Sequence, residues 1–225
     1  MLEIILDTET TGLSFNTDKI IEIACIELEN QIPTKNKFHV FINPNMDISD
    51  GAYQTHGISR DFLRDKPVFK DVAKEFLNFI KDSKLVIHNA DFDLAFLNKE
   101  LQELDLEPLS KDRVVDTLFL ARQKFPGSQA SLDALCKRFK INTSEREKHS
   151  ALVDCNLLTE VYIELLEKKE PLLDLQPSQP NINDLDSSKT INTSRKKIIV
   201  PITEEERNLH REFLKVHVPK SSMLN

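Results

Sequence analysis

The chain has 225 residues, of which 40% are hydrophobic and 30% charged, a composition typical of a globular protein. Its net charge of −7 argues against a broad basic face for long nucleic acid, although a protein that grips a few nucleotides through metal ions remains compatible with it. No apolar run approaches the ~18 residues of a membrane span, and the N-terminus has no basic leader, so we expect no membrane contact. The three cysteines lie far apart and predict neither disulfides nor structural zinc, which favours a cytoplasmic protein.

The predicted elements begin with strands and continue with alternating strands and helices. Three closely spaced strands are expected at 2–6 (LEIIL), 19–28 (KIIEIACIEL) and 37–44 (KFHVFINP), which predicts an antiparallel meander. The segments that follow are a helix at 68–82, a strand at 84–88, a helix at 91–104, a strand at 113–117 with a helix through Arg122, and helices at 131–139 and 150–168. This order predicts an α/β fold, with a mixed β-sheet flanked by α-helices.

The composition changes after Lys169. Residues 170–202 contain four prolines and many polar residues, which predicts a flexible linker between a domain at 1–169 and a C-terminal segment at 203–225. A helix is expected at 203–218, where Thr203 and Glu206 fit a capping box. The apolar stripe of this helix consists of Leu209, Phe213 and Val216. We expect the stripe either to bind a groove on a partner or to fold back on its own domain.

Two acids end the first strand. Asp7 and Glu9 lie two residues apart, so their side chains point to the same face. Adjacent carboxylates repel, and a hard divalent cation between them relieves the repulsion. Acids at an exposed strand end are also common, so this pair alone does not decide between the two interpretations.

Further acids lie near the starts of two predicted helices. Asn89 or Asp91 can cap the helix after the strand at 84–88, and a second cap is not needed at Asp93, although capping explains Asp93 taken alone as well as a function does. Asp154 shares a helical face with apolar residues, where a carboxylate is costly unless it is paired or binds a metal. His149 precedes that helix, and Ser150 is expected to cap it.

Together these clusters resemble the DEDDh exonucleases of the ribonuclease H-like superfamily, and most closely the DnaQ-like group of proofreading epsilon subunits of bacterial DNA polymerase III. The resemblance covers residues 2–166, and all five catalytic positions of the family pattern are filled. The segments that carry it are LDTETTGL (6–13), HGIS (56–59), VIHNADFDLAFLNKEL (86–101), VVDTLFLAR with FPG and SLDALC (114–136), and HSALVDC (149–155).

The resemblance implies hydrolysis of phosphodiester bonds at DNA 3′ ends, single-stranded or frayed, with two divalent ions, Mg²⁺ or Mn²⁺. Asp7 would bridge the ions, Glu9 and Asp154 would complete the site of the ion that activates water, and Asp93 would hold the other ion. His149 would accept the proton of the attacking water, since histidine titrates near neutral pH.

The resemblance also implies substrate contacts and partners. The terminal nucleotide would lie against Thr10, Leu13 and Phe92, with His56 and Asn89 contacting it or orienting neighbours, although these residues also suit ordinary packing. The tail would bind the alpha subunit of DNA polymerase III, and PLLDL (171–175) is either a sliding-clamp contact or simply the start of the linker.

Two other functions compete with this interpretation. One is an exoribonuclease of the same family that trims RNA 3′ ends, because the catalytic residues do not distinguish DNA from RNA. The other is an inactive module that only binds a polymerase or clamp, which the complete set of catalytic residues disfavours.

Asp116 lies directly before the helix predicted after the strand at 113–117, and its simplest role is to cap that helix.

Overall fold

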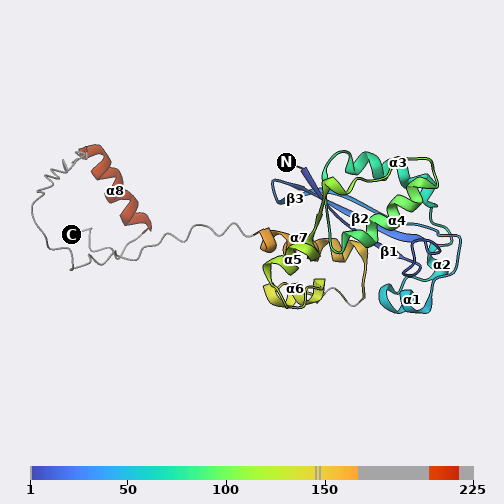
Figure 1. Cartoon of the computed structure of the whole chain (residues 1–225). Coiled ribbons are helices and arrows are strands. Elements are labelled where there is room, and N and C mark those ends of the chain that lie inside the picture. The colour runs from blue at the N-terminus through green and yellow to red at the C-terminus, as the bar shows by residue number, and fades with distance from the viewer. Residues whose placement is uncertain (1, 145, 147, 167–202, 218–225) are drawn as a thin grey trace, which may run out of the picture. The chain divides into compact units, whose positions relative to one another are not determined.

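The computed structural model describes residues 2–144, 146, 148–166 and 203–217, and the chain divides into two compact units, Met1–Leu173 and Asp174–Asn225. The strands of the first unit are β1 (Leu2–Thr10), β2 (Ile20–Glu29), β3 (Ile32–Phe41), β4 (Lys84–Ile87) and β5 (Val114–Asp116). Its helices are α1 (Asp50–His56), α2 (Arg60–Leu63), α3 (Phe69–Ile80), α4 (Ala90–Gln102), the 3₁₀ turn η1 (Lys111–Arg113), α5 (Thr117–Lys124), α6 (Leu132–Phe139) and α7 (Ala151–Leu166) (Figure 1).

The five strands form one mixed sheet in the order β3-β2-β1-β4-β5. The β1–β2 and β2–β3 pairs are antiparallel, whereas β1–β4 and β4–β5 are parallel. The expected meander and the mixed α/β architecture are therefore confirmed. Because β1, β4 and β5 run in the same direction, the segments that follow them emerge at one edge of the sheet.

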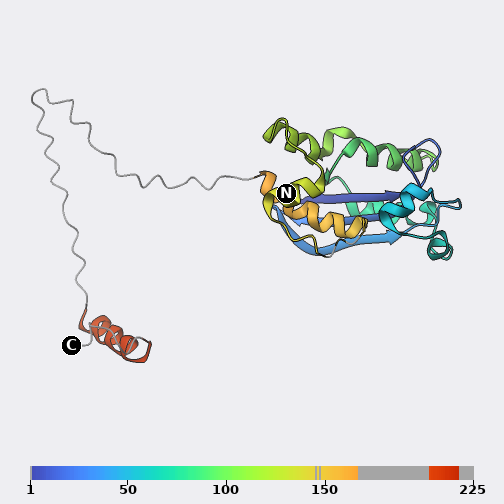
Figure 2. The same ribbon diagram turned by 90° about the horizontal axis from the view of Figure 1, so that it is seen from below.

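Alternating side chains of the central strand β1 enter two hydrophobic cores. Ile4 and Leu6 pack on the face covered by α3 and α4, and Ile5 packs on the face covered by α6 and α7. Helix α7 lies against β1 and β2, as Figure 2 shows. Asp7 and Glu9 continue the alternation of Ile5, so both carboxylates belong to the face that α7 covers.

Two short helices, α1 and α2, were not predicted from the sequence. Ser49 and Ser59 cap them by accepting hydrogen bonds from backbone N–H groups. Gly57 ends α1 in the left-handed conformation, with φ of 72°, which glycine adopts at little cost. These helices are too short to show a hydrophobic period, but α1 carries His56 and forms one wall of a cavity described below.

The second unit contains α8 (Glu204–His217) in its described part. The predicted capping box is present, because Thr203 Oγ1 accepts from the N–H of Glu206 at 3.2 Å and Glu206 Oε2 accepts from the N–H of Thr203 at 2.9 Å. Leu209 and Phe213 are 63% and 57% exposed. The side chain of Val216 and the predicted linker at 170–202 lie outside the described residues.

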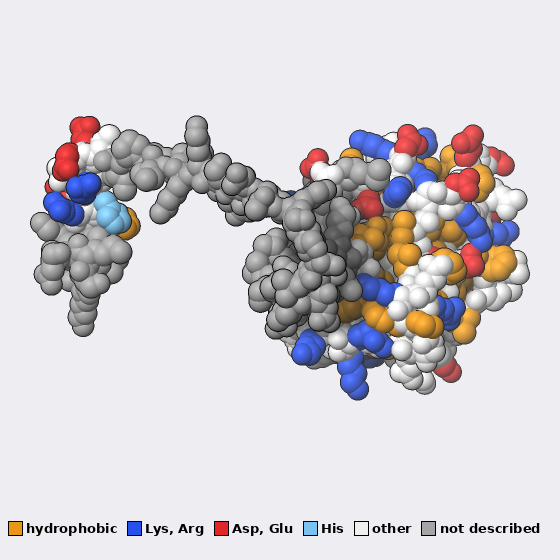
Figure 3. All heavy atoms as spheres, turned by 60° about the vertical axis from the view of Figure 1, so that its left-hand side comes forward, with side chains coloured by type: hydrophobic (Ala, Val, Ile, Leu, Met, Phe, Trp, Pro, Cys, Tyr) orange, Lys and Arg blue, Asp and Glu red, His pale blue; other side chains and the backbone are white. Residues whose placement is uncertain are grey.

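The surface of the first unit mixes charges of both signs. On the face shown in Figure 3, acidic and basic side chains are interspersed among the described residues. Within the ranges that the structure describes, no helix is long and apolar enough to cross a bilayer.

Candidate active site

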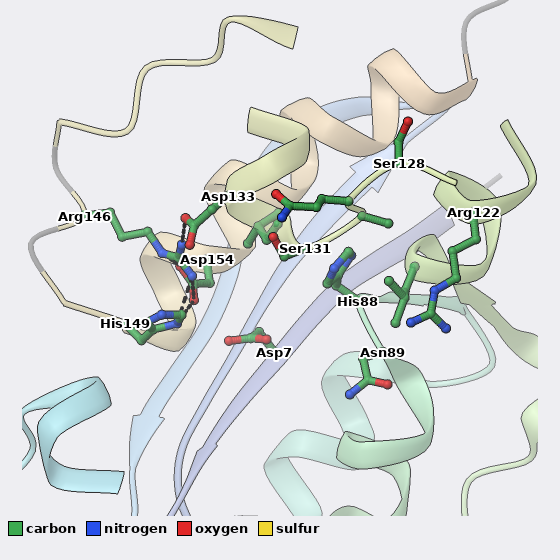
Figure 4. Close-up of a pocket in the computed structure, with 14 residues that line it drawn as sticks. Asp7, His88, Asn89, Arg122, Ser128, Ser131, Asp133, Arg146, His149 and Asp154 are labelled. Carbon is green, nitrogen blue, oxygen red and sulfur yellow. Dashed lines mark hydrogen bonds and ion pairs between the residues drawn. The ribbon is translucent and has the colours of Figure 1, made fainter. Parts of the chain in front are cut away.

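Five side chains predicted to carry the chemistry converge at the end of β1. Glu9, His149 and Asp154 offer ligand atoms that all lie within 4.8 Å of one another. Asp7 lies on the same face of β1 as Glu9, and Figure 4 shows its carboxylate pointing toward the space beside Asp154. Residues separated by more than 140 positions in the sequence therefore meet at one edge of the sheet.

Asp93 joins this group from the opposite side of the sheet. It lies in the first turn of α4, which follows the parallel strand β4. Its Oδ1 accepts hydrogen bonds from the hydroxyl of Thr8 at 2.7 Å and from the N–H of Thr8 at 3.1 Å. Thr8 stands between Asp7 and Glu9, so these bonds attach Asp93 to the strand that carries both acids.

Burial and mutual repulsion perturb three of the acids. Burial is the largest cause that raises the pKa of Asp7, and the charges of Asp93, Asp154 and Glu9 add to it. The pKa of Glu9 rises to about 8, through burial and then the charges of Asp154 and Glu22. Burial likewise raises the pKa of Asp93. In this arrangement the ionised acids are costly unless cations lie among them.

Arg146 supplies one such cation. Its Nε lies 2.5 Å from Asp154 Oδ1, and its Nη2 donates to Asp154 Oδ2 at 2.7 Å. Nη1 pairs with Asp133 on α6, so the guanidinium joins two helices. Nη2 also lies 2.8 Å from Nδ1 of His149, and because a guanidinium only donates, Nδ1 is the acceptor in this contact.

The donors at this edge fit a hard divalent cation. They are carboxylate oxygens with one imidazole, a set that suits Mg²⁺ or Mn²⁺ better than soft metals. Asp154 Oδ1 is buried and pairs with Arg146 Nε at 2.5 Å, so a metal ion that binds this oxygen would compete with the guanidinium for it.

Two cavities open beside the acids. The larger, of about 660 Å³, is lined by Asp7, Asn89, His149 and Asp154 among others (Figure 4). The smaller, of about 320 Å³, is lined by Glu9 and by four residues predicted to contact substrate, namely Thr10, Leu13, His56 and Phe92. The predicted substrate residues thus lie around the acids, four in one cavity and Asn89 in the other.

Three capping assignments can be compared with the structure. Asp116 caps α5 as expected, accepting from the N–H of Leu118 at 2.8 Å. Helix α4 has no side-chain cap from Asn89, and Asp91 lies inside its first turn and pairs with Lys111. Asn89 does occupy the N-cap position, with φ of 67° and its N–H donating to Asp116, so only the side-chain cap that Asn89 or Asp91 could supply is absent.

Sequence reasoning missed two residues of this site, Glu22 and Arg146. Glu22 stands in the apolar strand IIEIAC, where the argument applied to Asp154 would have identified it as a buried acid needing a partner. Arg146 lies in a polar loop, and nothing in the local pattern distinguishes it from a surface arginine. Only the packing of the loop against α7 places it beside Asp154.

The sequence of the chain is similar to a known protein family and to named bacterial proteins. A family model described as "Exonuclease" matches residues 4–162. The chain is 48% identical over 217 residues to the DNA polymerase III subunit epsilon of Rickettsia conorii, covering 94% of each protein. It is 41% identical over 230 residues to the subunit of the same name from Buchnera aphidicola, covering 98% of this chain and 97% of the relative.

The structure is also similar to a solved structure of an exonuclease. The chain resembles exonuclease X in complex with 5′ overhanging duplex DNA, with a TM-score of 0.58 and 29% identity. The similarity covers 73% of this chain and 90% of that one.

Proposed function

Because the chain belongs to the exonuclease family that includes the epsilon subunits of DNA polymerase III, we propose that it is the proofreading 3′–5′ exonuclease of a replicative DNA polymerase III. It hydrolyses the terminal phosphodiester bond of a single-stranded or frayed DNA 3′ end. The observation that supports this most directly is the convergence of Glu9, His149 and Asp154 within 4.8 Å.

Four carboxylates hold the metal ions in this proposal. Asp7 would serve both ions, Glu9 and Asp154 would hold the one that activates the attacking water, and Asp93 would hold the other. When bound, two divalent ions, Mg²⁺ or Mn²⁺, activate water and stabilise the charge that develops on the phosphate. The perturbed pKa values of Asp7, Glu9 and Asp93 are what is expected of acids arranged to bind cations.

His149 accepts the proton of the attacking water. Its side chain is 44% exposed, and it follows a polar loop, so it can reach both solvent and the acids. When Nδ1 accepts from Arg146, the neutral ring carries its proton on Nε2 and has no lone pair there, so Nε2 can act as the base only in the other tautomer, with the proton on Nδ1. Asp154 lies 3.2 Å from the same Nδ1, and it takes the place of Arg146 as the orienting partner if that nitrogen carries the proton.

The smaller cavity receives the terminal nucleotide. Leu13 and Phe92 offer apolar surfaces for the base, and a contact of this kind tolerates any base. Thr10 and His56 provide polar groups at the same cavity. Asn89 lies in the larger cavity, where it can contact the nucleotides that precede the terminal one.

DNA rather than RNA is the proposed substrate. The relatives from Rickettsia conorii and Buchnera aphidicola, at 48% and 41% identity, are subunits of a DNA polymerase, and the chain spans 94% and 97% of their length. The protein would act in the cytoplasm, where its three buried, unpaired cysteines suit a reducing environment.

The C-terminal segment at 203–225 would bind the alpha subunit of the polymerase. Helix α8 exposes Leu209 and Phe213, the anchors that an amphipathic helix places in a groove. In this proposal the domain at 1–169 carries the nuclease activity, and the linker at 170–202 joins it to the segment that binds the polymerase. PLLDL at 171–175 remains a candidate for a sliding-clamp contact, and it lies outside the described residues.

The test is metal-dependent degradation of matched DNA and RNA oligonucleotides labelled at the 5′ end. The proposal expects stepwise shortening of DNA from the 3′ end with Mg²⁺ or Mn²⁺, and none with EDTA. Asp7→Ala and Asp154→Ala should abolish cleavage while the circular dichroism spectrum stays unchanged. Near-normal activity in either purified variant would end the metal assignment, and faster degradation of RNA would favour the exoribonuclease.

A further inference from the structure

Glu22 is a buried acid that the proposed chemistry does not use. It lies on β2, directly opposite Glu9 in the antiparallel pair, and its relative exposure is 0%. Residues opposite each other on adjacent strands point to the same face of the sheet. The structure therefore places a further carboxylate beside Glu9, where it adds repulsion to an already acidic site.

The contacts of Glu22 lead to helix α7. Oε2 accepts a hydrogen bond from the N–H of Ala151 at 3.2 Å, and Oε1 accepts one from the hydroxyl of Ser150 at 3.1 Å. On the other side, Nε2 of His39 lies 2.7 Å from Oε1. Thus the carboxylate joins β3, β2 and the first residue of α7.

These contacts amount to a helix cap supplied by a distant strand. The first N–H groups of a helix have no partner within it, and a negative charge near them is favourable. Ser150 was expected to cap α7 by accepting from its backbone, but its hydroxyl donates to Glu22 instead. The start of α7 is consequently held by β2 rather than by its own sequence.

Two proposed active-site residues flank this attachment. His149 lies two residues before Ala151, and its N–H donates to the carbonyl of Thr55 at 3.2 Å. Asp154 lies three residues after Ala151, and its N–H donates to the carbonyl of Ser150 at 2.8 Å. Any shift of the first turn of α7 along the sheet would move both residues relative to Glu9.

We propose that Glu22 is a positioning residue of the exonuclease, which holds the first turn of α7 so that His149 and Asp154 remain within reach of Glu9. This inference rests on the proposed function, but the attachment itself can be measured without activity. Misplacing reacting groups by about 1 Å can lower a rate by about 10²-fold, and removing a group that orients a metal ligand typically costs about 10–100-fold.

The experiment uses the full chain with Glu22→Ala and Glu22→Gln. Glu3→Ala is the matched control, because Glu3 is also a buried acid of the sheet and accepts from the hydroxyl of Tyr162 at 2.8 Å, toward the other end of α7. Each folded protein is assayed for kcat and KM on a DNA oligonucleotide at saturating Mg²⁺. Hydrogen exchange of the Ala151 amide is followed by NMR in the same proteins.

We expect Glu22→Ala to lower kcat about 10–100-fold with KM within about threefold of the parent, and to accelerate exchange at Ala151. Glu22→Gln should retain part of the rate, because its amide oxygen can still accept from Ala151. Glu3→Ala should keep the parental kcat even if its thermal midpoint falls.

The inference is overturned if folded Glu22→Ala keeps the parental kcat, or if Glu3→Ala loses as much activity as Glu22→Ala. Should Glu22→Ala fail to fold, Glu22→Met, which nearly keeps the side-chain volume and removes both acceptor oxygens, takes its place, and parental kcat and Ala151 exchange in that folded variant would contradict the role. If the parent itself degrades no DNA, the proposed function fails, whereas equal activity of parent and Glu22 variants refutes only the positioning role.

Discussion

Without metal ions, the chain should lose stability as the pH rises through the neutral range. Glu9 ionises near its ordinary pKa of 4.5 when unfolded, but its pKa in the folded chain is about 8. Between these values the folded state holds a proton that the unfolded state has released, so the free energy of unfolding falls as the pH increases. Each unit of pKa shift corresponds to about 1.4 kcal/mol, which gives roughly 5 kcal/mol across the whole interval.

The measurement is urea unfolding of EDTA-treated chain at pH 6.0 and 7.5, compared with Glu9→Gln. Over this range the Glu9 carboxyl should lower the unfolding free energy of the parent by about 2 kcal/mol more than that of the variant. Burial lowers the pKa of His56 and His88, which has the opposite effect near pH 6, but both proteins share these histidines and the comparison cancels them. Glu27→Gln, which removes an acid of β2 bonded to Thr34, is the control and should keep the parental slope.

Adding Mn²⁺ should reverse the loss. Ions at about 100 times their dissociation constant add about 2.7 kcal/mol to the folded state, and more of this gain should appear at pH 7.5, where ionised acids bind cations without first losing a proton. Equal pH slopes of the unfolding free energy for the parent and Glu9→Gln in EDTA would refute the reasoning, because they would mean that folding does not raise the pKa of Glu9.

The other predictions concern the remaining groups of the site and the tail. His149→Ala should lower the rate by about 10²–10⁴-fold, and persistence of the acidic limb of the parental pH–rate profile would exclude it as the base. Arg146→Gln should bind Mn²⁺ more tightly in equilibrium titrations, because the ion no longer competes with the guanidinium for Asp154, and unchanged affinity would contradict this competition. The metal-free variant should also melt at a lower temperature than the metal-free parent. Deleting residues 170–225 should spare nuclease activity and remove polymerase binding, and a truncated chain that still co-purified with the polymerase would place the contact elsewhere.

Periodicity explains which features the sequence could predict. The strands and long helices were predicted because the apolar run over 2–6, the partial alternation over 19–28 and the stripe over 68–82 are strong signals, and the mixed sheet follows from their order. Asp7, Glu9 and Asp154 were identified by the same logic, since an acid on a buried face needs a partner. Their convergence then depends only on β1 and α7 packing together.

Features fixed by long-range packing could not be predicted. The cap of α7 comes from Glu22, 129 positions before Ala151, and no local pattern shows that two such residues will meet. The position of Arg146 depends on how a polar loop folds over α6 and α7. Local rules made the Ser150 hydroxyl an acceptor for its own helix, whereas in the structure it donates to Glu22 on a distant strand.

Charge counting at the edge of β1 indicates why two divalent ions suit this arrangement. Asp7, Glu9, Glu22, Asp93 and Asp154 contribute up to five negative charges when ionised. Arg146 offsets one, and the N-terminal turns of α4 and α7, which carry Asp93 and Asp154, each contribute about half a positive charge. About three negative charges are then left, which two divalent ions exceed by about one, and that excess is what an anionic phosphodiester needs in order to bind among carboxylates.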